Sequence, residues 1–282
     1  MKKKSICCWL CAATVAMAGC VNSIPDDDET IEENEIKRIC FQAKMETEPM
    51  SRAALKDAFN VLDYRRVTSG VIARSVAQKA QDENFGCIED VLPYGKHTCF
   101  FVGHQSEITS MTADGIASFS KVTDTFSAKA ELEVNAQTDA SQSITLIRRV
   151  AKLEIVCTDA LPDNLKTMEM VIEGGSVTLN AATGKGGAVT TQRKTIQIPT
   201  SNIGVKNCTF SSYVFLPEES GTVKLTATAK DAGGSIISTH TFDSVEMQTN
   251  YITRYTGGLF SEDQSFQLSV DSEWAGTKDY PF

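Results

Sequence analysis

The chain has 282 residues, of which 41% are hydrophobic and 22% are charged, with 18 glycines and 7 prolines. Its length predicts about two domains, and its composition excludes a disordered or collagen-like chain because it supplies enough apolar side chains for a core. The formal net charge is −9. An acidic chain without a basic cluster binds nucleic acid poorly, since contacts to phosphate need Lys and Arg, so we expect no nucleic-acid partner.

The N-terminus has the pattern of a bacterial export signal. Three lysines at positions 2–4 precede an apolar stretch over 6–17 that is too short to span a bilayer as a helix. Met-Ala-Gly-Cys then ends at Cys20, which resembles the lipobox of bacterial lipoproteins. The resemblance implies cleavage between Gly19 and Cys20 and acylation of Cys20, with palmitate as a typical acyl chain. The alternative is an ordinary secretory signal that contains a cysteine.

Residues 20–35 predict an acidic tether between the lipid and the folded body. Asp26–Glu29 is a run of four acidic residues, and such a run repels itself and stays solvated. An acidic run close behind the lipid also resembles the surface-export signal of certain Gram-negative lipoproteins. The residue after Cys20 is Val rather than the Asp of an inner-membrane retention signal. We therefore expect a lipid-anchored, surface-exposed position on the cell outer membrane.

Five cysteines remain beyond Cys20 and raise the question of disulfides. They are Cys40, Cys87, Cys99, Cys157 and Cys208. No two of them have the spacing of a zinc site or of a CxxC motif. Most lie in apolar runs, which favours buried free thiols. Two disulfides are the alternative for an exported chain.

The sequence lacks the common motifs of catalysis and phosphate binding, including GxSxG, HExxH and Walker A. His97 and Cys99 stand two residues apart and would share one face of a strand. Together they could form a Cys–His nucleophile pair or part of a metal site. A half-buried histidine beside a core cysteine is the simpler interpretation. We expect no enzyme activity, no metal and no cofactor.

Apolar and polar residues alternate with a period of two in most of the body. The pattern recurs at 39–45, 126–135, 153–157, 168–172, 222–230 and 266–270. Each segment fits a strand with one face buried and the other in water. Only 51–60 suggests a helix, and it could equally be a loop that enters the next strand. Many short strands without intervening helices predict an all-β chain of antiparallel sandwiches.

The weakest apolar stretch of the body lies at 174–192, and we expect a domain boundary there. The predicted organisation is a signal peptide at 1–19, a lipidated acidic tether at 20–35, an N-terminal β-sandwich at 36–178 and a C-terminal β-sandwich at 179–282.

An ordered series of segments within 37–276 resembles one family, the fimbrillin or type V pilin proteins of anaerobic Gram-negative bacteria. The segments include EPMSRAAL at 48–55, VLDY at 61–64, PYGKH at 93–97, RRVAKLEI at 148–155 and NYITRYTG at 250–257. The resemblance is greatest to the branch of lipoprotein fimbrial anchor and accessory subunits. It implies two transthyretin-like sandwiches in a structural fimbrial lipoprotein that supports cell adhesion, with other fimbrial subunits as partners.

The resemblance also implies assembly by strand exchange. In stalk subunits an Arg-specific protease removes the lipidated segment and the first strand, and a strand from the next subunit fills the groove. Arg38 and Arg52 are the candidate processing sites here, and the alternative for each is a solvated arginine. The strand at 39–45 is the expected occupant of the groove before cleavage. Because the anchor-like branch matches best, we favour a chain that keeps this strand.

A second hypothesis is a surface lipoprotein that binds glycan or host protein through the same sandwiches. Glycan platforms usually expose Trp and Tyr, and Trp274 is the single tryptophan beyond the signal. The composition therefore favours the fimbrial hypothesis.

The lipobox hypothesis predicts that Cys20→Ala blocks lipidation and moves the protein from outer-membrane to soluble fractions. The reason is that no later apolar run reaches the length of a membrane span. Palmitate labelling and fractionation measure this, and a variant that still behaves as an integral membrane protein would contradict the hypothesis.

Overall fold

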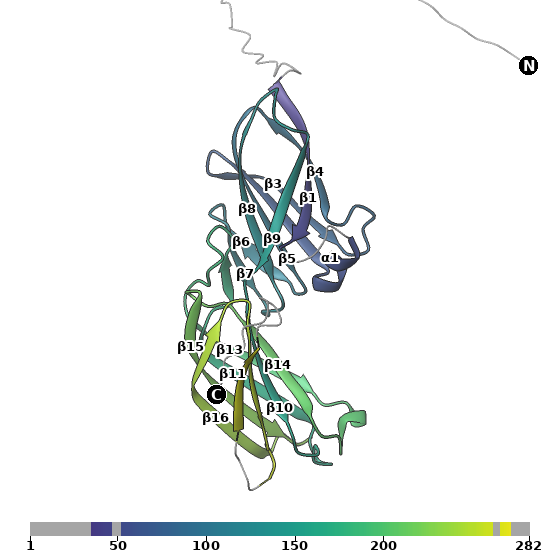
Figure 1. The fold of residues 1–282 in the computed structure, drawn as a ribbon, viewed down its shortest axis with the longest axis vertical. Helices are drawn as coiled ribbons and strands as arrows, with labels where there is room; N and C mark the ends of the chain where they lie inside the picture. The colour runs from purple at the N-terminus through teal and green to yellow at the C-terminus, as the bar shows by residue number, and fades with distance from the viewer. Residues whose placement is uncertain (1–34, 47–51, 262–265, 272–282) are drawn as a thin grey trace, which may run out of the picture. The chain divides into compact units, whose positions relative to one another are not determined.

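The computed structural model describes residues 35–46, 52–261 and 266–271. In this part the chain is built almost entirely of β-strands, as Figure 1 shows. The all-β sandwich prediction is confirmed. A short helix, α1 (Arg52–Ala58), lies in the segment that suggested a helix, and a 3-10 turn occupies Thr200–Asn202.

Seven strands of the first half form one sheet in the order β3-β2-β5-β8-β9-β1-β4. They are β1 (Ile36–Met45), β2 (Val61–Thr68), β3 (Val71–Lys79), β4 (Cys87–Pro93), β5 (Gly95–His104), β8 (Phe126–Val134) and β9 (Ser141–Arg148). All neighbours are antiparallel except β1 and β9, which run parallel.

This sheet folds over at the β8–β9 contact, where only Phe126–Arg148 and Ser127–Ile147 are paired. Strands on either side of the contact then face each other across one core. The ring of Phe41 on β1 lies 5.6 Å from that of Tyr64 on β2 and 5.4 Å from that of Phe101 on β5. The first half is therefore a sandwich of β3-β2-β5-β8 against β9-β1-β4.

The second half contains two four-stranded sheets, β14-β10-β17-β18 and β13-β11-β15-β16. Their strands are β10 (Ala151–Cys157), β11 (Thr167–Gly175), β13 (Thr190–Gln197), β14 (Cys208–Val214), β15 (Ser220–Lys230), β16 (Ile236–Gln248), β17 (Ile252–Gly257) and β18 (Phe266–Asp271). The core between them includes the fully buried Leu153, Met170 and Leu225. The inward positions are those that the alternation predicts.

A small sheet takes strands from both halves of the chain. It consists of β6 (Ile108–Met111), β7 (Ile116–Phe119) and β12 (Thr178–Asn180), with β7 in the middle. Phe119 on β7 packs against Phe215, with ring centroids 5.1 Å apart.

The chain passes from the sheet of the first sandwich to those of the second at an earlier position than the expected domain boundary. Strands β10 and β11 precede residue 178, yet they pair with β13, β14, β15 and β17 of the second half. The change of sheet falls between Arg148 and Ala151. The 174–192 stretch holds the end of β11, the three-residue strand β12, the segment after it and the start of β13, which is an edge strand with no fully buried residue.

The alternation in β15 predicts a sharp contrast between neighbouring positions. Leu225→Asp places a charge where the wild-type side chain is 0% exposed, so it should lower the free energy of unfolding by about 4 kcal/mol or more. Thr226→Asp, on the opposite face of the strand, should change it by less than about 1 kcal/mol. Chemical denaturation followed by circular dichroism measures both, and equal effects would contradict the assignment of faces.

Candidate functional site

The first strand, β1, is an interior strand of its sheet. It pairs antiparallel with β4 from Ile36–Pro93 to Gln42–Cys87 and parallel with β9 from Cys40–Ser141 to Met45–Leu146. A strand from the start of the body thus completes a layer whose other strands come later in the chain. Its removal would leave β4 without a neighbour in the sheet.

One face of β1 fills the sandwich core. Ile39 is 0% exposed, Phe41 1% and Ala43 7%, and Met45 packs against the same cluster. Burial of each large side chain is worth about 1.5–3 kcal/mol relative to water. This is the face that the alternation predicts to be buried, and within the intact chain it fills the core of the first sandwich.

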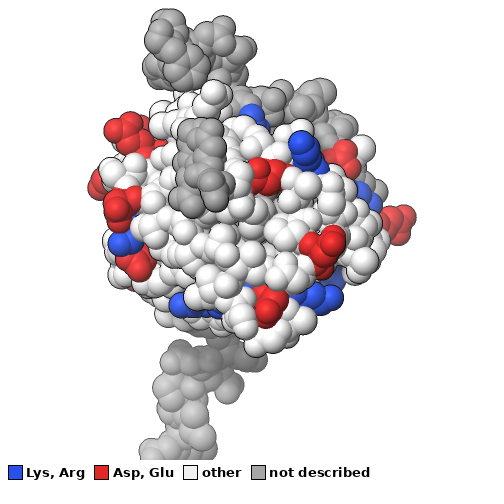
Figure 2. Space-filling model, turned by 90° about the horizontal axis from the view of Figure 1, so that it is seen from below, with Lys and Arg blue, Asp and Glu red and all other residues white. Residues whose placement is uncertain are grey.

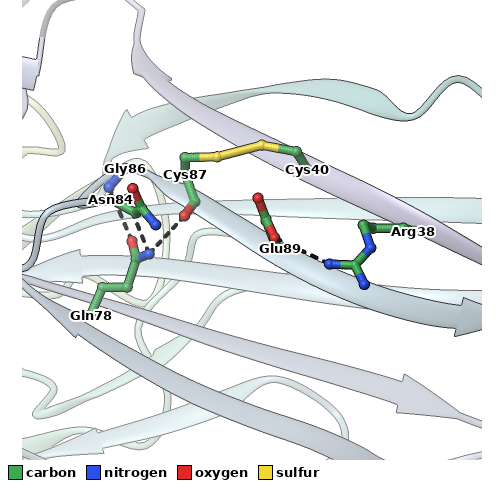
Figure 3. The surroundings of a disulfide bond; sticks show 7 residues. All are labelled: Arg38, Cys40, Gln78, Asn84, Gly86, Cys87 and Glu89. Atoms are coloured by element: carbon green, nitrogen blue, oxygen red, sulfur yellow. Dashed lines mark hydrogen bonds and ion pairs between the residues drawn. A yellow bond between two sulfur atoms is a disulfide. The ribbon is translucent and has the colours of Figure 1, made fainter.

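The other face of β1 carries a covalent link. A disulfide joins Cys40 on β1 to Cys87 on β4, with the Cα atoms 6.3 Å apart (Figure 3). Beside it Arg38 lies 3.6 Å from the carboxylate of Glu89. The cysteines are 47 residues apart in sequence, and closing a loop of that length stabilises the fold by about 4 kcal/mol in the loop-entropy model.

The expectation of free thiols is therefore wrong for Cys40 and Cys87. Ile39 and Phe41 point inward, so Cys40 between them points outward, although it lies in an apolar run. The other three cysteines, Cys99, Cys157 and Cys208, are free and buried, as expected.

A buried charge cluster fixes β4 from the core side. Asp90 on β4 has a fully buried side chain. Its carboxylate accepts hydrogen bonds from Tyr64 Oη at 2.8 Å, Arg66 Nε at 2.9 Å and Arg74 Nη1 at 2.8 Å. Because Tyr64 and Arg66 lie on β2 and Arg74 on β3, the cluster joins the two layers of the sandwich.

A single glutamine holds the start of β4 in place. Gln78 on β3 donates from Nε2 to the carbonyl oxygens of Asn84 (3.1 Å) and Cys87 (2.7 Å), and its Oε1 accepts from the amide of Gly86 at 3.0 Å. Figure 3 shows this side chain reaching the segment that carries the disulfide. The disulfide from β1 therefore reaches β4 at a point where hydrogen bonds from Gln78 hold the backbone.

The candidate processing sites have different surroundings. Arg38 lies within β1, with 75% of its side chain exposed. Arg52 is the first residue of α1. Gly19, Cys20 and Trp274 lie outside the described residues, so signal cleavage, lipidation and the role of that tryptophan stay predictions.

His97 and Cys99 do not form a reactive pair. His97 is 3% exposed, and its ring nitrogens contact Thr68 Oγ1 and the carbonyl oxygen of Pro93, each at 2.8 Å. Cys99 instead contacts Tyr64 Oη at 3.4 Å, and burial raises the pKa of its thiol to about 11. The interpretation as a histidine beside a core cysteine is supported, and the histidine is more deeply buried than expected.

The described surface carries several open pockets of about 350–570 Å³. One pocket of about 540 Å³ lies beside His97, Lys96 and Glu131, and no phenylalanine, tyrosine or tryptophan lines it. The described residues contain no group of three or more His, Cys, Asp or Glu placed to hold a metal ion. On the face in Figure 2, acidic and basic side chains are interspersed among uncharged ones. No helix in the described part of the chain has the length and apolar character to cross a membrane.

Sequence reasoning found the first strand but missed the links that hold it. The outward position of Cys40 could have been inferred from the alternation around Phe41. The pairing with Cys87 and the convergence of two arginines on Asp90 could not, because they depend on which strands become neighbours.

The fold and this site define an all-β protein of two sandwiches, whose first strand completes the first of them. The chain belongs to a family of unknown function, DUF6562, whose model matches residues 100–281. No curated protein matches the sequence.

Several solved structures share the fold. A candidate adhesin from Bacteroides ovatus is 11% identical, with a TM-score of 0.52 over 81% of this chain and 88% of that one. A candidate polysaccharide-binding protein (DUF1812) from Bacteroides thetaiotaomicron is 14% identical, with a TM-score of 0.54 over 84% and 96%. A candidate cell adhesion protein from Bacteroides eggerthii is 10% identical, with a TM-score of 0.50 over 84% and 96%. At these identities the likeness concerns the fold.

The charge cluster predicts unequal costs for two neighbouring carboxylates on β4. Asp90→Asn leaves Arg66 buried without a full counter-charge and should lower the free energy of unfolding by about 3–5 kcal/mol. Glu89→Gln removes only an exposed pair and should cost less than about 1 kcal/mol. Urea denaturation of both variants measures this, and similar midpoints would show that the cluster contributes no net stability.

Proposed function

We propose that this protein is a structural surface lipoprotein that acts in cell adhesion as a fimbrial subunit of the fimbrillin kind. The observation that carries the proposal is the place of β1, an interior strand supplied by the start of the folded body. Strand exchange requires such an element, because a homologous strand from another subunit can take its hydrogen bonds and pockets. The adhesion-type descriptions of proteins with this fold point to the same class.

Within that class we propose the anchor or accessory role rather than the stalk role. A stalk subunit has to give up its first strand, whereas β1 here is joined to β4 by a disulfide. The lipid on Cys20 would then hold the protein on the outer membrane. The folded body would bind the last subunit of a fibre, so that the fibre ends at the membrane.

Glycan binding is the second candidate, because one structure with this fold is described as a candidate polysaccharide-binding protein. The pocket beside His97 lends it no support, since no large aromatic ring lines it for stacking on a sugar. A phenylalanine, Phe260, lines a second pocket of about 410 Å³.

The fimbrial proposal predicts that deletion of the gene releases surface fibres from the cells, because an anchor ties them to the membrane. Electron microscopy of cells and culture medium, with immunogold labelling of this protein, measures it. Complementation with the wild-type chain should restore attached fibres with label at their bases, and complementation with Cys20→Ala should not. Unchanged fibres, together with polysaccharide binding by the purified protein, would favour the second candidate.

A further inference from the structure

The disulfide brackets one of the two candidate cleavage sites and not the other. Arg52 lies between Cys40 and Cys87 in sequence, whereas Arg38 precedes both. Hydrolysis of the bond after Arg52 adds one water and creates a new carboxylate and a new amine. The two pieces are still joined through the sulfur atoms. Hydrolysis after Arg38 instead frees everything that precedes Ile39.

We propose that the Cys40–Cys87 disulfide is a covalent clamp that keeps β1, and the tether before it, on the body after a backbone cut between the two cysteines. A cut at Arg52 then detaches neither the strand nor the lipid anchor expected on Cys20. A cut at Arg38 detaches the tether and the first three residues of β1, but leaves the rest of the strand, from Ile39 to Met45, in the chain. The clamp does not depend on the fimbrial assignment, since it concerns any protease that cuts within this loop.

The contacts around the disulfide make the clamp effective. β1 is hydrogen-bonded to both β4 and β9. β4 is in turn held to β3 by Gln78 and by the Arg74–Asp90 pair. The disulfide therefore links the first strand to a strand that β2 and β3 also keep in place. After a cut in the loop, β1 separates from the body only when the disulfide is broken and its hydrogen bonds to β4 and β9 are lost.

Release of the clamped strand requires a thiol reductant. In thiol–disulfide exchange, two thiols of a small thiol or a protein dithiol are oxidised to a disulfide. Cys40 and Cys87 each receive one electron and one proton and become free thiols. An incoming strand from another protein can replace β1 only after both this exchange and a backbone cut.

The test uses the full chain with a site-specific protease sequence inserted after Met50, inside the disulfide loop. A matched control carries the same insert after Ala136, in the exposed turn between β8 and β9 and outside the loop. After complete cutting, the first protein should run as one species on a denaturing gel without reductant and as two fragments with it. The control should give two fragments in both conditions. Fragments from the first protein without reductant would overturn the proposal.

A second measurement follows exchange under native conditions. The probe is a fluorescent synthetic peptide of residues 36–45 with serine in place of Cys40. It should enter the cut protein after treatment with dithiothreitol, and it should enter a cut Cys40→Ser/Cys87→Ser variant without reductant. Uptake by the cut, oxidised wild-type chain should be at least tenfold lower.

Equal uptake by oxidised and reduced protein would overturn the clamp. Uptake by none of the samples would overturn it as well, because packing alone would then hold the strand. Should the double variant fail to fold, the comparison of oxidised with reduced wild-type chain decides the question by itself.

Discussion

The first sandwich depends on the insertion of β1 between β4 and β9. Its inward side chains, above all Phe41, fill the space between the two layers. The remaining strands of that layer come from later segments of the chain, so the layer is complete only when the start of the body returns to it. Pairing between strands that are distant in sequence loses conformational entropy when the intervening chain closes into a loop, and the contact energy is gained only afterwards. The core contacts of β1 offset that cost.

The second sandwich follows the same rule. Its first strand, β10, pairs antiparallel with β14 and parallel with β17, as β1 does with β4 and β9. Each core is therefore closed by the strand that enters it first. In both sandwiches the first strand therefore lies between two strands that come later in the chain.

The contacts of strand β4 show how the first strand is held in the first sandwich. It lies at the edge of its sheet, with β1 as its single neighbour there. An edge strand with one partner opens easily unless other contacts restrain it. Here the restraint comes from side chains on both faces, with Asp90 bound by two arginines on the core side and Cys87 bonded to Cys40 on the outer side. These links bind both strands to the opposite layer.

The sequence by itself determined the all-β class, most strand positions and the inward faces, as at Ile39, Phe41 and Leu225. The physical reason is that a period of two is a local property, which a strand shows whichever neighbours it acquires. The tertiary structure alone decided that β1 runs parallel to β9, that the sheets change at Arg148–Ala151, that Cys40 bonds Cys87 and that two arginines converge on Asp90. Each of these depends on contacts between residues distant in sequence, and an alternating strand is compatible with many partners until the cores close around it.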